Sequence, residues 1–347
     1  MKEFNAYTEI HHSYREMERT MQTVLSHSDK IQDFFSTDGD IVFVACGSSY
    51  WMSLSAAAVM RYHTGKSAVA VKAADVVMFP AEHKNRYNRP IFVAPSRSGL
   101  SRELIDALQF LLAEYPGAKL FSITEYEKNE IENMADFNLS IPFANEISVC
   151  QTRSFNCLYT AFLTITAILS GSDSLISEMQ EYFAAAPELY RQGEEKVKKM
   201  LDDLGHVDSL VTLGAGRQYG IVIEGAYISI EMAQLPANYY QTLEYRHGPI
   251  VTAKKGVLAL ICSGGASSLH YELQMAKEIL ATGAIPAMIW GEGNGWDGPV
   301  FSMGKAYLPE VVSLYFIFIA QSVAYYVALQ RHVDPDNPGE LTRFITY

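Results

Sequence analysis

Short apolar runs alternate along the chain with longer stretches in which apolar residues recur at helical spacing. In the first half these runs predict strands at residues 41–45, 68–71, 91–94, 120–124 and 139–141. The runs at 41–45 and 91–94 are apolar at every position, which is typical of parallel strands buried on both faces. Because helical patterns separate the strands, the sequence predicts βαβ units and a parallel sheet with helices on both faces.

The second half repeats this pattern. Strands are predicted at 209–214, 257–262 and 285–290, and loops of small residues followed by helical patterns come after the first two. The polar stretch Ser170-Gly171-Ser172-Asp173-Ser174 separates the halves. We therefore expect two domains of related architecture, residues 1–174 and 175–347.

The composition is that of a folded globular chain. Of the 347 residues 49% are hydrophobic and 19% are charged, so large cores are expected and disorder is not. The net charge of −12, without a local cluster of lysine and arginine, argues against a nucleic-acid partner. Residues 311–329 approach the length of a bilayer span. Their glutamine, serines and tyrosines instead predict a helix buried in a core or a subunit interface, with no membrane partner.

The cysteines and the first residues bear on the compartment. The four cysteines include no CxxC pair, and three of them end apolar strand-like runs, so we predict buried free thiols in a reducing environment. The first residues lack the apolar core of a signal peptide. These features predict a cytoplasmic protein. The nine histidines show no metal-ligand spacing, so we expect no metal and no cofactor.

Serine-rich loops follow two of the predicted strands. Ser96-Arg97-Ser98-Gly99-Leu100-Ser101 comes after the strand at 91–94, and a helical pattern follows it. Backbone N–H groups at such a helix start, beside serine hydroxyls, can hold a phosphate or another anion, although Ser101 could instead simply cap the helix. Cys46-Gly47-Ser48-Ser49-Tyr50 follows the first strand in the same way. In a parallel sheet both loops lie at the carboxyl edge, where ligands bind, and this favours the phosphate site.

Two acidic side chains lie on the helix predicted after residue 214. Glu224 and Glu231 are seven residues apart and share one face of an otherwise apolar helix. Burial would raise the pKa of such a carboxyl and make it a proton-transfer group; a carboxyl that pairs with a backbone amide is the structural alternative. His247 stands immediately before Gly248-Pro249, at a turn of the chain, where a structural role is the ordinary one.

Together these segments resemble the double-SIS phosphosugar isomerases. This family includes the isomerase half of glucosamine-6-phosphate synthase, amino-sugar-6-phosphate isomerase/deaminases and fructosamine-6-phosphate deglycases. The resemblance covers nearly the whole chain and rests on an ordered set of segments: residues 46–50, 96–101 and 149–155, Glu224 to Glu231, His247-Gly248-Pro249 and Asp334 to Pro338. It implies an α/β fold of two SIS domains, each a parallel sheet flanked by helices in a flavodoxin-like three-layer sandwich.

The resemblance also implies the residues that bind the substrate. The phosphate would be held by the residues of the second serine loop, namely Ser96, Arg97, Ser98 and Ser101. The sugar would be contacted by Ser48, Ser49, Val149 and Glu224. The glycine-rich loop at residues 263–268 is interpreted as a degenerate copy that does not bind a second phosphate.

Three further positions match residues that carry the chemistry in this family. Glu231 would be the base that moves a proton between C1 and C2. His247 would assist ring opening and would come from the partner subunit, which implies a homodimer with shared sites. Arg343 stands where the synthase has a lysine. Arginine stays protonated and cannot form an imine, so we expect electrostatic contact with the sugar there.

These expectations define an enzyme acting on a hexose or hexosamine 6-phosphate. We expect an aldose/ketose isomerase of the amino-sugar-6-phosphate isomerase/deaminase type, with glucosamine 6-phosphate as an example. The sequence shows no glutamine-amidohydrolase half, so deamination or isomerisation is expected over synthesis. A fructosamine-6-phosphate deglycase is the enzymatic alternative. A non-catalytic sugar-phosphate sensor is the alternative of another class, but the N-terminus is too short and insufficiently basic for a DNA-binding helix-turn-helix.

Overall fold

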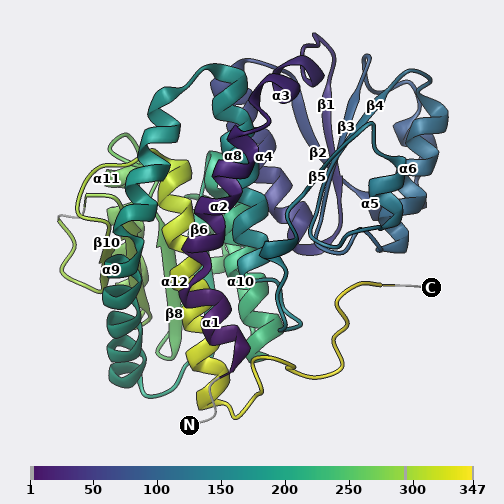
Figure 1. Cartoon of the computed structure of the whole chain (residues 1–347). Helices are drawn as coiled ribbons and strands as arrows, with labels where there is room; N and C mark the ends of the chain where they lie inside the picture. Colours follow the sequence, from purple (N-terminus) through teal and green to yellow (C-terminus); the bar gives the residue numbers. More distant parts are fainter. Residues whose placement is uncertain (1–3, 293–294, 346–347) are drawn as a thin grey trace. The chain divides into compact units, whose positions relative to one another are not determined.

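The computed structural model describes residues 4–292 and 295–345 (Figure 1). The chain divides into two compact units, each made of segments that are distant in the sequence. Of the described residues, the N-terminal unit takes 15–146, 153–176 and 342–345. The C-terminal unit takes 4–14, 147–152 and the described part of 177–341. The polar stretch at 170–174 contains the turn between two long helices, which end at Ser170 and begin at Asp173, respectively. The boundary between the two units lies within the second helix, after Ile176.

A parallel sheet is the centre of the N-terminal unit. Its strands are β1 (Ile41–Ala45), β2 (Ala68–Lys72), β3 (Ile91–Ser96), β4 (Lys119–Thr124) and β5 (Phe137–Ser140). They are arranged in the order β2-β1-β3-β4-β5, and every pair is parallel. This is the flavodoxin-like order, in which the chain switches direction between β1 and β3.

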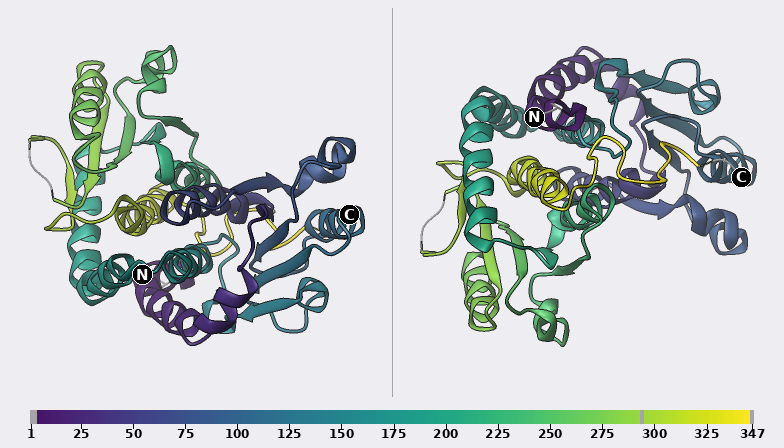
Figure 2. Two further views of the ribbon diagram at one scale, coloured as in Figure 1. Left: turned by 90° about the horizontal axis from the view of Figure 1, so that it is seen from above. Right: turned by 90° about the horizontal axis from the view of Figure 1, so that it is seen from below.

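Helices cover both faces of this sheet (Figures 1 and 2). On one face Val42, Val44 and Phe92 pack into a cluster with residues of α6. On the other face the ring of Phe43 meets that of Phe162 in α8, with centroids 5.0 Å apart. Successive strand residues point to opposite faces, so a strand covered on both sides must be apolar throughout. The helices that belong wholly or mostly to this unit are α2 (Ser13–Leu25), α3 (Ser28–Phe34), α4 (Gly47–Thr64), α5 (Ala73–Met78), η1 (Pro80–His83), α6 (Arg102–Glu114), α7 (Glu130–Met134), η2 (Pro142–Ala144) and α8 (Arg153–Ser170).

The C-terminal unit contains a second parallel sheet of the same design. Its strands are β6 (Ser209–Gly214), β7 (Ala237–Gln241), β8 (Val257–Cys262), β9 (Ile285–Trp290) and β10 (Val300–Ser302). The order is β10-β9-β8-β6-β7, which becomes 2-1-3-4-5 when read from the other edge and numbered from β6. The accompanying helices are α1 (Asn5–His11), α9 (Asp173–Leu204), η3 (Gly216–Gln218), α10 (Tyr219–Ala233), η4 (Glu244–Arg246), η5 (Pro249–Thr252), α11 (Leu269–Ala281) and α12 (Pro309–Gln330).

The predicted α/β class with two parallel sheets flanked by helices is therefore confirmed, as is the repeated architecture. Two strands were missed by the pattern. β7 is a half-exposed edge strand of sequence Ala-Asn-Tyr-Tyr-Gln, which has neither an apolar run nor clear alternation. β10 is only three residues long and lies at the opposite edge. Edge strands are buried on fewer sides, so their sequences carry a weaker signal.

The apolar helix α12 is a core element, as the sequence indicates. It is long and apolar enough to cross a bilayer, but 94% of its apolar window is buried within the protein. Within the described residues it is the single helix of that kind. It packs against α10 and α1 of the same unit. Its hydropathy is therefore explained by its place in the core of the C-terminal unit.

Candidate functional site

The two serine loops leave the N-terminal sheet at one edge. β1 and β3 are neighbours in parallel register, with Ile41 opposite Ile91 and Phe43 opposite Val93. The loop after β1 and the loop after β3 therefore both start at the carboxyl end of the strands. Because the strand order switches between these two strands, this is the position at which doubly wound sheets bind ligands.

The Ser96–Ser101 loop is a tight turn closed by its own side chains. The Ser96 hydroxyl accepts a hydrogen bond from Gly99 N–H (2.9 Å), and the Ser98 hydroxyl accepts one from Leu100 N–H (3.1 Å). Gly99 has φ +66°, and a Cβ there would overlap the side-chain amide of Asn129. Glycine is therefore required by both the backbone conformation and the available space.

Ser101 does not behave as a helix cap. It stands at the N-cap position of α6, yet its side chain makes no capping hydrogen bond to any described residue. The structural alternative for this serine, a capped turn, is thus not what is observed. Its half-buried hydroxyl remains available at the start of the helix, where N–H groups and the helix dipole favour an anion.

Ser48 and Ser49 occupy the first turn of α4, beside the same edge. Both side chains are almost fully buried. The neighbouring thiol of Cys46 has its pKa raised to about 12, chiefly by burial and also by Glu103. Burial also raises the pKa of Cys157 and Cys262 well above the ordinary value. The predicted burial of the thiols is confirmed for Cys150, Cys157 and Cys262, whereas Cys46 is only partly buried.

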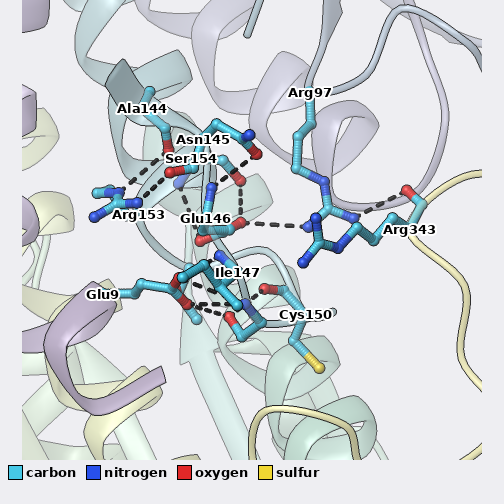
Figure 3. A network of polar contacts seen from close by, with 12 residues as sticks. Glu9, Arg97, Ala144, Asn145, Glu146, Ile147, Cys150, Arg153, Ser154 and Arg343 are labelled. Atoms are coloured by element: carbon cyan, nitrogen blue, oxygen red, sulfur yellow. Dashed lines mark hydrogen bonds and ion pairs between the residues drawn. The ribbon is translucent and has the colours of Figure 1, made fainter. Parts of the chain in front are cut away.

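Arg97 of the Ser96–Ser101 loop belongs to a network of polar contacts with other charged residues (Figure 3). Arg97 is only 4% exposed, and its guanidinium contacts the carboxylate of Glu146 (Nη1 to Oε1, 3.3 Å). Another guanidinium nitrogen donates to the main-chain carbonyl of Arg343 (2.9 Å). Glu146 also accepts hydrogen bonds from the N–H and the hydroxyl of Ser154 at the start of α8. Two of the predicted site residues, Arg97 and Arg343, are thus brought together.

Glu125 joins this network and was not singled out by the sequence analysis. It follows β4, and its N–H donates to the carbonyl of Arg97 (3.1 Å). Its buried carboxyl has no hydrogen-bond partner among the described residues. Burial, and then the charge of Glu146, raises the pKa of Glu125 well above its usual range, whereas Arg97 and Arg153 lower it. Its position immediately after an apolar strand was the available signal, since such positions line the ligand edge.

The remaining predicted residues belong to the C-terminal unit. Glu224 is fully buried on α10, and Glu231 is half-buried two turns further on. Tyr227 lies on the same face, three residues after Glu224 and four before Glu231. Burial raises the pKa of its phenol, and the charges of Glu231 and Glu224 raise it further. His247 is exposed and follows η4, in the turn before Pro249. The two carboxyls therefore share a helix face as predicted.

Val149 lies in a segment, residues 147–152, that is held by hydrogen bonds at several points. Its N–H donates to the carbonyl of Asp336 (3.0 Å). The carboxylate of Asp336 in turn caps α1, where it accepts from the N–H groups of Asn5 (3.0 Å) and Ala6 (2.7 Å). Glu9 of α1 returns to the segment and accepts from the N–H groups of residues 147 and 148 and from the Ser148 hydroxyl (Figure 3). Sequence reasoning did not identify Glu9 or Asp336 as anchors of this segment.

The loop at residues 263–268 stands in the C-terminal sheet where Ser96–Ser101 stands in the other. Here the donors are already used. The Ser263 hydroxyl donates to Glu272 of α11 (2.6 Å), and Gly264 N–H donates to the same carboxylate (2.9 Å). A carboxylate of the protein itself thus occupies the position of an anion. Among the described residues, no three His, Cys, Asp or Glu side chains are grouped to hold a metal ion.

The comparisons with known proteins agree with this geometry. Residues 34–170, which contain β1 to β5 and both serine loops, match the family model of the SIS domain. This part of the chain is thus similar to the SIS domain. The second sheet, β6 to β10, has the same strand order as the first and lies outside the matched range.

Similarity extends beyond the matched range to nearly the whole chain. The glutamine–fructose-6-phosphate aminotransferase (isomerizing) of Buchnera aphidicola is 24% identical over 97% of this chain. The chain spans about half the length of such curated relatives, 58% in this case. Among solved structures, a glucosamine-6-phosphate deaminase from Thermotoga maritima has a TM-score of 0.85 and 25% identity, covering 98% of this chain and 99% of that one.

A third similar protein shares the fold. It is the C-terminal domain of glucosamine-fructose-6-phosphate aminotransferase from Francisella tularensis, with a TM-score of 0.81 and 19% identity. The match covers 97% of this chain and 99% of that domain. The fold of both units therefore recurs, in one chain, in other proteins.

Proposed function

We propose that the protein is a phosphosugar isomerase of the amino-sugar-6-phosphate isomerase/deaminase type, and that its C-terminal unit is a second SIS domain. The Ser96–Ser101 loop carries the proposal. It follows β3, at the point where the strand order of the sheet reverses between β1 and β3. The hydroxyl of its Ser101 caps nothing among the described residues. The likeness to a glucosamine-6-phosphate deaminase over 98% of the chain supports an amino-sugar phosphate as substrate.

Binding of the substrate's phosphate is assigned to the N-terminal unit. The hydroxyls of Ser96, Ser98 and Ser101, with neighbouring backbone N–H groups, would hold the 6-phosphate. Ser48 and Ser49, in the first turn of α4, would contact sugar hydroxyls, with Val149 and Glu224 as further contacts. Fixing the phosphate positions the reacting carbons and lowers the entropic cost of reaching the transition state.

Proton transfer is assigned to Glu231. In the open-chain aldose, the Glu231 carboxylate takes the proton from C2, the electron pair of that C–H bond forms the C1–C2 double bond, and the C1 oxygen takes a proton from water. Return of the proton from Glu231 to C1 converts this enolamine into an iminium at C2, which gives its nitrogen proton to the hydroxide left by that water and becomes an imine. Water then hydrolyses the imine to fructose 6-phosphate and ammonia. The cationic side chain of Arg343 would stabilise negative charge on the sugar oxygens.

Ring opening is assigned to His247. We propose that it acts in a homodimer with shared sites, for which its exposed position in the turn before Pro249 is suitable. The free thiols of Cys46, Cys157 and Cys262 support placing the protein in the cytoplasm. Neither a cofactor nor a metal has a part in the proposed reaction.

The test is to supply glucosamine 6-phosphate and measure fructose 6-phosphate and ammonia. A parallel reaction with a 6-phosphofructosamine–amino acid conjugate measures free amino acid. Ammonia from the first substrate alone is expected. Amino acid from the second alone would identify a deglycase instead, and tight binding without turnover of either would indicate a sensor.

Glu231→Gln is the matching variant, since it keeps size and removes the base. We expect kcat to fall by roughly a hundredfold or more, the usual contribution of a general base. An unchanged melting temperature, with binding of the sugar phosphate retained, would separate this loss from unfolding. A variant as active as the original protein would remove Glu231 from the mechanism.

A further inference from the structure

Residues 342–345, which we call the tail, belong to the N-terminal unit. Two of their main-chain carbonyls accept hydrogen bonds, one from the Ser96–Ser101 loop and one from the residue that follows it. The guanidinium of Arg97 donates to the carbonyl of Arg343 (Nη2 to O, 2.9 Å). The N–H of Arg102, the first residue of α6, donates to the carbonyl of Ile345 (3.1 Å). Both acceptors are carbonyls, so the tail is held by its backbone and the Arg343 side chain is not needed for these bonds.

The Arg97 side chain that contacts the tail is also held by the carboxylate of Glu146. This side chain is 4% exposed, and the carboxylate with which it pairs is fully buried. Glu146 is itself fixed by the N–H and hydroxyl of Ser154 at the start of α8. The planar guanidinium carries several donors in fixed directions, so one arginine can engage a carboxylate and a carbonyl at the same time. Figure 3 shows Arg97 lying between Glu146 and the main chain of Arg343.

From this geometry we infer that Arg97 is a positioning residue that holds the tail at the substrate loop, rather than a ligand of the phosphate. The serine hydroxyls of the loop remain to donate to the phosphate. Arg97 links the loop to the tail on one side and, through Glu146, to the start of α8 on the other. The consequence for the reaction, correct placement of Arg343 at the sugar, rests on the proposed function.

The attachment itself is tested without substrate, by hydrogen exchange of the Arg102 amide and by chymotrypsin cleavage at Phe344. Arg97→Gln should accelerate both by roughly tenfold or more, since it removes hydrogen bonds made by a charged donor. Arg343→Ala is the matched control. It should leave exchange at Arg102 unchanged, because the substitution keeps both acceptors, the main-chain carbonyls of Arg343 and Ile345. Unchanged protection in Arg97→Gln would overturn the inference.

A second variant keeps the test valid if Arg97→Gln fails to fold. Loss of the arginine alone leaves the carboxylate of Glu146 buried without its cation, which is strongly destabilising. Arg97→Gln combined with Glu146→Gln removes both charges and keeps two side chains that can hydrogen-bond. This double variant should melt as a cooperative unit and should still lose protection of the tail. If its tail is as protected as in the original protein, Arg97 is not the anchor.

Binding and activity then distinguish a tail anchor from a phosphate ligand. Affinity for inorganic phosphate should change by less than about twofold in Arg97→Gln; a tenfold loss with normal tail protection would make Arg97 a phosphate ligand. With glucosamine 6-phosphate, Arg97→Gln plus Arg343→Ala should be no slower than Arg343→Ala alone, because both act through one step. Additive losses would contradict this. If no sugar phosphate is turned over, the proposed function fails, and the exchange experiment still decides the attachment.

Discussion

The loops at residues 96–101 and 263–268 occupy the same place in two sheets of the same order, and they differ in what fills them. Each has six residues, begins and ends with serine and leads into a helix, α6 or α11. In the second loop, Ser263 and Gly264 donate to the carboxylate of Glu272. Both loops also have a serine that accepts from a loop amide, Ser96 from Gly99 (2.9 Å) and Ser263 from Gly265 (3.3 Å). Neither Ser101 nor Ser268 makes a side-chain cap to a described residue, so the difference lies in the carboxylate of Glu272.

One helix position explains much of this difference. Glu272 is the fourth residue of α11, and the fourth residue of α6 is the buried Ile105. An isoleucine provides no acceptor, so it cannot take the hydroxyl hydrogens of the first loop's serines, whereas Glu272 accepts from the Ser263 hydroxyl and the Gly264 amide of the second loop. The repeated fold thus gives the protein two equivalent loops at the carboxyl edges of its sheets. A single side chain on the following helix decides whether such a loop can bind an anion. The comparison agrees with the interpretation of residues 263–268 as a degenerate copy.

The largest expected effect comes from the glycines that shape the two turns. Gly99 and Gly265 both have positive φ, +66° and +96°, but a Cβ at Gly265 would meet open space, whereas one at Gly99 would overlap Asn129. Gly265→Ala should cost about 1–2 kcal/mol of unfolding free energy through backbone strain. Gly99→Ala should cost about 3–4 kcal/mol, since overpacking adds to the strain. Urea denaturation measures both; equal losses would show that the Asn129 contact is unimportant.

The next prediction concerns a variant of α6 that carries a carboxylate at the position of Glu272 on α11. Ile105→Glu places an acceptor at the position that Glu272 has on α11, so we expect affinity for glucosamine 6-phosphate to fall by about a hundredfold, or about 2.7 kcal/mol. Ile105→Gln is the neutral control of the same size. Calorimetric titration measures the affinity, and melting curves show whether each variant is folded. If Ile105→Glu binds as tightly as Ile105→Gln, charge at this position does not block the loop.

A smaller loss is expected from the serines that end the loops. Ser101→Ala removes a hydroxyl that caps nothing among the described residues, so its unfolding free energy should change by less than about 0.5 kcal/mol. Its affinity for the sugar phosphate should fall about tenfold, as for the loss of one charge-assisted hydrogen bond. Ser268→Ala removes the corresponding hydroxyl, which donates to Gly265 O (3.2 Å). It should leave affinity unchanged; equal losses in the two variants would contradict the assignment of one binding loop.

The position of the binding loop could be predicted from the sequence, but the residues that hold Arg97 could not. Apolar strands followed by small residues and serines could be recognised locally, because burial on both faces determines the whole run. The partners of Arg97 could not, since Glu146 is 49 residues away and Arg343 is 246 residues away. The same holds for Glu9, which meets Ser148 across 139 residues. Such pairs follow from the packing of distant segments, whereas residue spacing describes only neighbours within one helix or strand.

The smallest effect concerns pH and the carboxylate that fills the second loop. Burial raises the pKa of Glu272 above its usual value of 4.5, although hydrogen bonds from Gly264, Ser263 and Ser268 oppose the shift. The folded state therefore holds this proton more tightly than the unfolded chain does. Stability from Glu272 is greatest below pH 4.5 and declines as the pH rises through the raised pKa. Glu272→Gln cannot titrate, so its unfolding free energy should decline less with pH over that window.

Urea denaturation at intervals from pH 4 to 8 measures this difference. Asp203→Asn, which removes an exposed carboxylate paired with Lys199 on α9, is the control for a general change in charge. A steeper decline in Glu272→Gln than in the original protein would mean that its hydrogen bonds outweigh burial. The second loop would then stabilise a full negative charge on Glu272, and its donors would resemble an anion site more closely than its burial indicates.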